Sequence, residues 1–186
     1  MKKSSQDRID EIVTNLYREF ELEFPVESPK AVIEKMGGTF STAVKYKVGD
    51  EAIVKKHKGK PEILVCINEY LYGIDDHSRV ETDWMIYRTL GQAILCMGYW
   101  VKPEKWDTFP DGNYPYKNLR FRREVEQMEY FASAMILPKT LFLNELILNT
   151  NVGSYETTVD VWKMAEELRT TMPMVLERAK QLNVQL

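Results

Sequence analysis

One apolar segment near the middle of the chain limits the possible folds most strongly. Residues 83–98 are almost continuously hydrophobic, interrupted mainly at Arg88, Thr89, Gly91 and Gln92. At 100° per residue, Arg88, Thr89 and Gln92 share one face of a helix. The pattern therefore predicts a buried helix that directs a short polar stripe toward a cleft.

The chain is long enough to bury a sizeable core around this helix. It has 186 residues, of which 44% are hydrophobic, and this fits one compact domain with a small helical appendage. We expect the domain over residues 1–150 and the appendage, packed on it, over residues 151–186. Because polar residues interrupt the apolar segment, it does not predict a membrane span.

Before the central helix, residue periodicity predicts two helices and a small sheet. Apolar residues at helical spacing from Ile9 to Phe20 predict the first helix, and Ser28-Pro29 begins a second that Gly37-Gly38 ends. Gly49-Asp50 is predicted to turn the chain between two antiparallel strands. The period of two predicts three strands in a mainly antiparallel sheet, over residues 40–48, 52–56 and 63–68.

After the central helix, the chain is predicted to be mostly helical, which gives an α+β fold. Residues 101–118 are rich in proline and aromatic residues and are expected to be an irregular loop. Helices are predicted at 124–138 and 141–148, then a linker at 149–155. A helix-turn-helix-like pair follows at 158–168 and 173–182. Its expected buried stripe is Val159, Trp162, Ala165, Leu168, Val175, Ala179 and Leu182.

The charge pattern does not favour binding to nucleic acid or to a membrane. The net charge is −3 and the signs are interspersed. In the C-terminal pair, four basic side chains, among them Arg178, are matched by four acidic ones. No secretory signal is expected, and Cys66 and Cys96 are interpreted as small core residues in a reducing compartment. We therefore expect a cytoplasmic protein.

The polar stripe has the spacing of a zinc-binding helix. Arg88-Thr-Leu-Gly-Gln92 occupies the frame of a His-Glu-x-x-His motif, in which two imidazoles hold the metal and the glutamate activates water. Arginine has no lone pair to give a metal, and a glutamine carbonyl is a poor zinc ligand. Thr89 is no general base without an activating partner. The helix is therefore not predicted to catalyse zinc hydrolysis.

A downstream segment carries a family resemblance. Residues 124–138, EVEQMEYFASAMILP, resemble the E-A-N-x-F-A-A-x-L-L-M-P segment of the ImmA/IrrE family of metallopeptidase-like proteins. Residues 24–38, 62–68 and 159–186 also resemble parts of that family, so the resemblance covers nearly the whole chain. It implies a zincin-like fold. The family's third zinc ligand, a glutamate, corresponds to Gln127, with Glu126 as its neighbour if the register slips by one.

The resemblance implies a vestigial cleft without zinc or catalytic residues. A buried Arg88 requires a partner, and Glu124 or Glu126 on the opposing helix is the expected one. His57 lies among lysines and His77 follows two aspartates, and neither has zinc-helix spacing. No metal role is predicted for either histidine.

The family resemblance implies an ancestral role in cutting helix-turn-helix repressors of mobile elements or stress regulons. We predict that this chain is an inactive pseudoprotease that binds a regulatory protein of that kind without cleaving it. An active metallo-endopeptidase, or another hydrolase with a non-standard site, is the alternative hypothesis. A third hypothesis is a small-molecule sensor that uses the old cleft.

Overall fold

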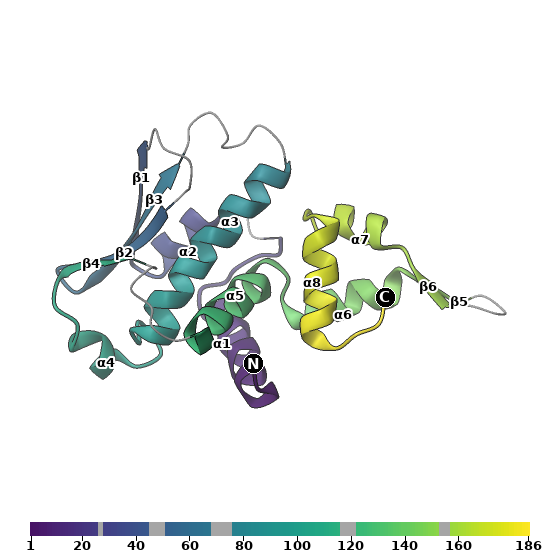
Figure 1. The fold of residues 1–186 in the computed structure, drawn as a ribbon, viewed down its shortest axis with the longest axis horizontal. Helices are drawn as coiled ribbons and strands as arrows, with labels where there is room; N and C mark the ends of the chain where they lie inside the picture. Colours follow the sequence, from purple (N-terminus) through teal and green to yellow (C-terminus); the bar gives the residue numbers. More distant parts are fainter. Residues whose placement is uncertain (26–27, 45–50, 68–75, 116–121, 153–156) are drawn as a thin grey trace.

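The fold places a small sheet at one end, a group of helices in the middle and a helical C-terminal unit at the other end (Figure 1). The computed structural model describes residues 1–25, 28–44, 51–67, 76–115, 122–152 and 157–186. The prediction of a mixed, mostly helical chain is confirmed. The helices are α1 (Lys3–Glu19), α2 (Pro29–Lys35), α3 (Asp76–Gly91), the π-helix η1 (Gln92–Cys96), α4 (Pro103–Asp107), α5 (Arg122–Ile136), α6 (Lys139–Leu148), α7 (Val161–Glu167) and α8 (Met172–Leu182).

The main sheet has four strands in the order β1-β3-β2-β4: β1 (Thr39–Val44), β2 (Glu51–His57), β3 (Lys60–Ile67) and β4 (Gly112–Pro115). The three predicted strands are confirmed, and two of the three strand pairs are antiparallel. The predicted pairing of the first two strands is wrong, because β1 runs parallel to β3 and β3 lies between β1 and β2. The turn predicted at residues 49–50 lies outside the described residues.

The fourth strand was not predicted, and a buried lysine explains it. Lys56 is 7% exposed, and its ammonium donates to the carbonyls of Trp106 and Phe109, each at 2.8 Å. The Trp106 indole N–H in turn donates to the Gly59 carbonyl at 2.7 Å. These contacts hold the proline-rich segment on β2, where Tyr114 pairs with Val54. The prediction of an irregular loop over 101–118 is therefore wrong for α4 and β4.

The helices α3 and α5 form the centre of the core. A β-carbon on Gly91 would lie 2.9 Å from the Phe131 ring, so the absence of a side chain permits the close packing of the two helices. The predicted central helix is confirmed, although it begins earlier, at Asp76, and continues as the π-helix η1. His77 falls in the first turn of α3, and its side chain is outside the described part of the structure.

The chain bends by 55° between α5 and α6. Pro138, which has no N–H and cannot continue the helix, lies at this break. Across the described ranges, no single helix is long and apolar enough to cross a membrane. Helices α5 and α6 reach that length and hydropathy only as a bent pair.

The C-terminal unit has its own hydrophobic cluster. Because this cluster includes Leu137 and Phe142, α6 packs with α7 and α8 although it precedes residue 150. Part of the predicted linker, 149–155, forms strand β5 (Thr150–Val152), which pairs with β6 (Thr157–Val159). The buried members of the cluster are Leu137, Phe142, Met164, Ala165, Leu168, Val175 and Ala179.

Two predictions about the C-terminal pair are wrong. Helix α7 begins at Val161, because the Asp160 side chain accepts from the Lys163 N–H at 3.0 Å and caps the helix. Trp162, predicted to be buried, is 72% exposed, and Met164 is buried instead. The two residues point to different sides of α7, since residues two apart are separated by about 200° on a helix.

A buried ionic network joins the C-terminal unit to the rest of the fold. Arg178 of α8 is fully buried, and its guanidinium donates to the Asp10 carboxylate of α1 at 2.8 Å and to the Leu137 carbonyl at 2.9 Å. The other Asp10 oxygen accepts from the Tyr130 hydroxyl of α5 at 2.8 Å. Its sequence context suggested that Arg178 lies on a solvated, charge-balanced helix surface. The structure shows instead that it is buried in this network.

We expect Arg178→Met to lower the free energy of unfolding by about 3 kcal/mol, because the Asp10 carboxylate loses its buried partner. Asp10→Asn should destabilise the chain by a similar mechanism. Urea unfolding of both single variants and of the double variant should give a double-mutant loss well below the sum of the single losses. Lys180→Met, at an exposed site of α8, is the control and should change stability little. Additive losses would contradict the pairing.

Candidate functional site

The polar residues of the central helix satisfy backbone groups inside the protein. Thr89 is 1% exposed, and its hydroxyl donates to the Met85 carbonyl one turn earlier at 2.9 Å. Gln92 is 4% exposed, and its amide nitrogen donates to the Tyr114 carbonyl of β4 at 3.1 Å. The Gln92 carbonyl oxygen is buried without a hydrogen-bond partner among the described residues. Both side chains thus take part in packing α3 and η1 against their surroundings.

Arg88 lies half-buried beside a different surface. Its guanidinium carbon is 4.9 Å from the centre of the Trp84 ring, which allows a cation–π contact within α3. Arg88 and Trp84 line a cavity of about 370 Å³ together with Pro173 and Met174 of α8. The polar stripe therefore divides between two surroundings: Arg88 faces the C-terminal unit, and Gln92 faces the sheet.

The predicted pairing of Arg88 with a carboxylate of α5 is not found among the described ion pairs. Glu126 instead lies 3.1 Å from the Arg122 guanidinium on the same helix and 3.4 Å from the terminal amino group of Met1. The Arg122–Glu126 contact is an i,i+4 pair on the surface of α5. Glu124 is close enough to Cys96 for its charge to affect the pKa of that thiol.

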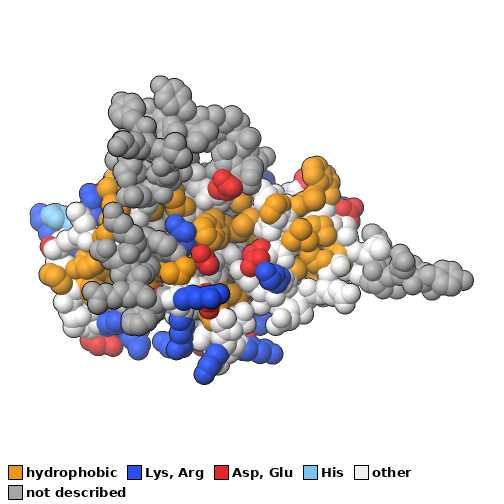
Figure 2. Space-filling model, viewed as in Figure 1, with side chains coloured by type: hydrophobic (Ala, Val, Ile, Leu, Met, Phe, Trp, Pro, Cys, Tyr) orange, Lys and Arg blue, Asp and Glu red, His pale blue; other side chains and the backbone are white. Residues whose placement is uncertain are grey.

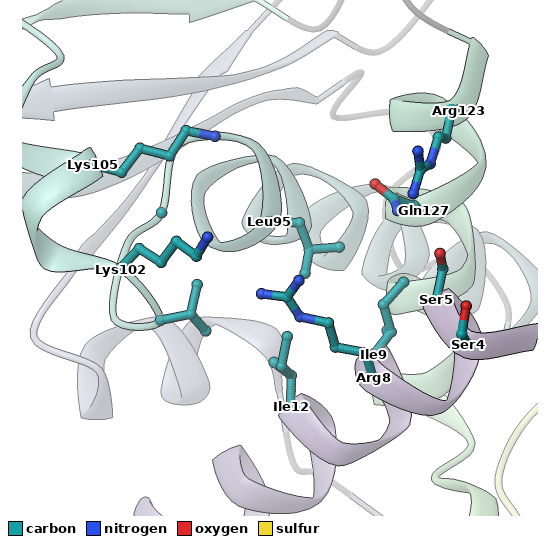
Figure 3. A pocket seen from close by; sticks show the side chains of 12 residues that line it. Ser4, Ser5, Arg8, Ile9, Ile12, Leu95, Lys102, Lys105, Arg123 and Gln127 are labelled. Atoms are coloured by element: carbon teal, nitrogen blue, oxygen red, sulfur yellow. The ribbon is translucent and has the colours of Figure 1, made fainter. Parts of the chain in front are cut away.

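Gln127 lines a cavity, and Arg88 is not among the residues that line it. This cavity of about 310 Å³ lies between α1, α4, η1 and α5, and Leu95 and Gln127 both line it (Figure 3). The structure therefore distributes the six predicted positions, Arg88, Thr89, Gln92, Glu124, Glu126 and Gln127, over several surroundings rather than around one centre.

The residues at the motif positions do not fit a zinc ion. Arg88 has no lone pair to donate, and Gln127 lines a different cavity from Arg88. Gln92 offers only an amide oxygen, a weak zinc donor beside imidazole or thiolate. Within the described ranges, no three His, Cys, Asp or Glu side chains are grouped closely enough to hold a metal ion.

The cavity beside Gln127 is strongly basic. Arg8 of α1, Lys102 and Lys105 at α4, and Arg123 of α5 line it, and Figure 3 shows their side chains around one opening. None of its described lining residues is acidic. We call these four residues and the space between them the basic pocket. Four apolar residues, Ile9, Ile12, Leu95 and Val101, also line it.

Sequence reasoning missed the basic pocket because its charges come from distant segments. Arg8 and Arg123 are 115 positions apart; Arg8 lies among acidic residues, and Arg123 lies between Arg122 and Glu124. Lys102 and Lys105 are three residues apart and Arg122 and Arg123 are adjacent, but small groups of basic residues are common on protein surfaces. The fold places α1, α4, η1 and α5 around one cavity and so brings the four side chains together.

The C-terminal unit exposes three large apolar side chains at the end of α6 and the start of α7. Ile147, Leu148 and Trp162 are 72%, 73% and 72% exposed. The β5–β6 hairpin brings the end of α6 beside the start of α7, where the Asp160 N–H donates to the Asn149 carbonyl at 3.0 Å. Figure 2 shows hydrophobic atoms at the surface of this unit. We call these three residues the C-terminal apolar surface.

Helix α3 also carries a carboxyl group with an unusual titration. The Asp83 side chain is 16% exposed, and burial raises its pKa to about 6, although Arg79, 3.6 Å away, partly opposes the shift. Well below pH 4, the carboxyl is protonated in both folded and unfolded chains. As the pH rises to about 6, only the unfolded chain loses the proton, so the stability of the folded state decreases.

We therefore expect Asp83→Asn to raise the free energy of unfolding by about 1–2 kcal/mol at pH 7.5 and to have little effect near pH 3.5. Denaturant unfolding at the two pH values measures this difference. The exposed Asp107→Asn on α4 is the control and should show no such change between the two pH values. An Asp83→Asn variant that is less stable than the wild type at pH 7.5 would contradict the expected penalty.

The chain was also compared with known proteins. No protein-family model matches it, and no curated protein sequence matches it. The resemblance described above therefore remains an inference from the residues themselves.

Proposed function

We propose that this chain is a catalytically inactive, ImmA/IrrE-like regulatory protein that acts in the cytoplasm by binding another protein. The proposed partner is a helix-turn-helix regulator of a mobile element or stress regulon, as the family resemblance implies. The observation that carries the proposal is the C-terminal apolar surface, Ile147, Leu148 and Trp162.

The exposure of these side chains supports a protein-binding role. A tryptophan that is 72% exposed leaves a large apolar area in water, and aromatic residues are enriched at protein interfaces. Two further exposed apolar side chains, Ile147 and Leu148, lie at the end of α6, which the strand pair β5–β6 joins to the start of α7. The Arg178–Asp10 network fixes the unit that presents this area to the remainder of the fold.

The surroundings of the motif positions support the absence of peptidase chemistry. Thr89 occupies the position of the catalytic glutamate and donates its hydroxyl to a backbone carbonyl. Gln92, at the second histidine position, binds a carbonyl of β4. A hydrolytic zinc site requires three ligands around one open coordination position. These side chains act instead as packing and hydrogen-bonding groups of the core.

The proposal predicts a stable complex that depends on Trp162. The tagged wild-type chain should isolate a helix-turn-helix regulator from its native cytoplasm, and the purified partner should bind with a measurable Kd. Trp162→Ser should weaken that binding at least about tenfold. Truncation of an aromatic hot-spot residue costs about 2 kcal/mol or more of binding free energy. Isothermal titration calorimetry measures the change.

Glu104→Ser, at an exposed position on α4, is the matched control and should leave the Kd unchanged. Equal binding by wild type and Trp162→Ser would contradict the role of the apolar surface. The partner should also remain intact after prolonged incubation, as judged by its mass. Site-specific cleavage by the wild-type protein would favour the alternative function, a hydrolase with a non-standard site.

A second prediction concerns metal content. Protein purified without chelators should contain far less than one zinc ion per chain, because Arg88, Gln92 and Gln127 replace the expected ligand types. Elemental analysis by mass spectrometry measures the ratio. A ratio near one zinc per chain, lost on mutation of His77 or Cys66, would contradict the proposal.

A further inference from the structure

The basic pocket has the features of a ligand site that the proposed function does not use. We propose that it binds a phosphorylated small molecule that carries two or more phosphate groups. The site consists of Arg8, Lys102, Lys105 and Arg123 around a cavity of about 310 Å³. It lies beside Gln127, between α1, α4 and α5, and is separate from the C-terminal apolar surface (Figure 3).

The charges of the pocket are not compensated within the described part of the chain. Among the described residues, none of the four basic side chains forms an ion pair or a side-chain hydrogen bond, whereas the neighbouring Arg122 pairs with Glu126. Glu124 lies near enough to affect the pKa of Cys96, as does Lys105, but it does not line the cavity. Four cations around one space repel one another, and a bound anion relieves that repulsion.

The number of charges indicates the class of ligand. A terminal phosphate group carries about −1.5 to −2 charges near neutral pH, so two such groups carry about −3 to −4 and match four cations. The two arginines present planar donor groups that bind phosphate oxygens in pairs, and the lysines add point charges. The hydroxyls of Ser4 and Ser5 in the first turn of α1 and the Gln127 amide supply further donors at the wall.

The shape of the pocket favours a small molecule over a nucleic acid strand. Its volume is near the lower end of the range for small-molecule sites, about 300–1,000 Å³. Its apolar lining residues suit a compact organic group beside the phosphates. A nucleic acid surface requires a basic stripe along the protein, and the chain as a whole has a net charge of −3.

The test uses the full chain and defined probes. Calorimetric titration in low salt with pyrophosphate, tripolyphosphate and ATP should show one site per chain for at least one of them. Affinity should increase from orthophosphate to the multiply charged probes and should decrease when salt is added, because screening weakens exposed charges. Two-dimensional NMR should place the largest shift changes at residues that line the pocket.

Lys102→Gln/Lys105→Gln should weaken binding of the best probe about five- to thirty-fold, since each exposed charge contributes about 0.5–1 kcal/mol. Arg8→Gln should weaken it in the same direction. Lys60→Gln is the control, an exposed lysine outside the pocket, and should leave affinity unchanged. All these side chains are exposed, so circular dichroism and Tm without ligand should match the wild type.

Three results would overturn the proposal. The first is no saturable binding of any phosphate probe in low salt. The second is binding that the double lysine variant and Arg8→Gln do not weaken relative to Lys60→Gln. The third is a single-stranded oligonucleotide, or the tricarboxylate citrate, that binds more tightly than every phosphate probe through these residues. None of these measurements uses the protein partner, so failure of one proposal leaves the other intact.

Discussion

The buried Arg178–Asp10 ion pair is the contact on which the arrangement of the two hydrophobic clusters depends. A fully buried guanidinium is tolerated only when its donors are satisfied, and Arg178 reaches the Asp10 carboxylate, the Leu137 carbonyl and Gln181. The Tyr130 hydroxyl donates to the other oxygen of this carboxylate, and the centre of the Tyr130 ring lies 4.9 Å from the guanidinium carbon. Helices α1, α5 and α8 therefore meet in one geometry, because any other would leave a charge buried without a partner.

The sheet depends on a second buried cation. Lys56 draws the carbonyls of the proline-rich segment onto the edge of β2, and Trp106 returns a hydrogen bond to Gly59. With that segment in place, β4 pairs with β2, and the Tyr114 carbonyl becomes available to Gln92. A side chain that the zinc motif would have directed at a metal is thus incorporated into the contact between η1 and the sheet.

The two surfaces that carry the functional proposals lie on different parts of the molecule. The C-terminal apolar surface belongs to α6 and α7, and the basic pocket lies between α1, α4 and α5. Helix α5 contacts both α1 and the buried guanidinium of α8. The same helix therefore lines the basic pocket and holds the C-terminal unit in position. A phosphorylated ligand and a protein partner would therefore bind to one connected framework.

The sequence by itself determined the elements with strong periodicity: α1, α2, α3, α5 and the first three strands were all predicted, since the hydrophobic period depends only on local order. It also identified Arg88, Thr89 and Gln92 as polar side chains on an apolar helix. Tertiary structure decided the rest, because strand order, the fourth strand and the basic pocket depend on residues far apart in the chain. Trp162 and Arg178 show this most clearly: a helical pattern predicts which residues share a face, but only the packed neighbours determine that the tryptophan is exposed and the arginine buried.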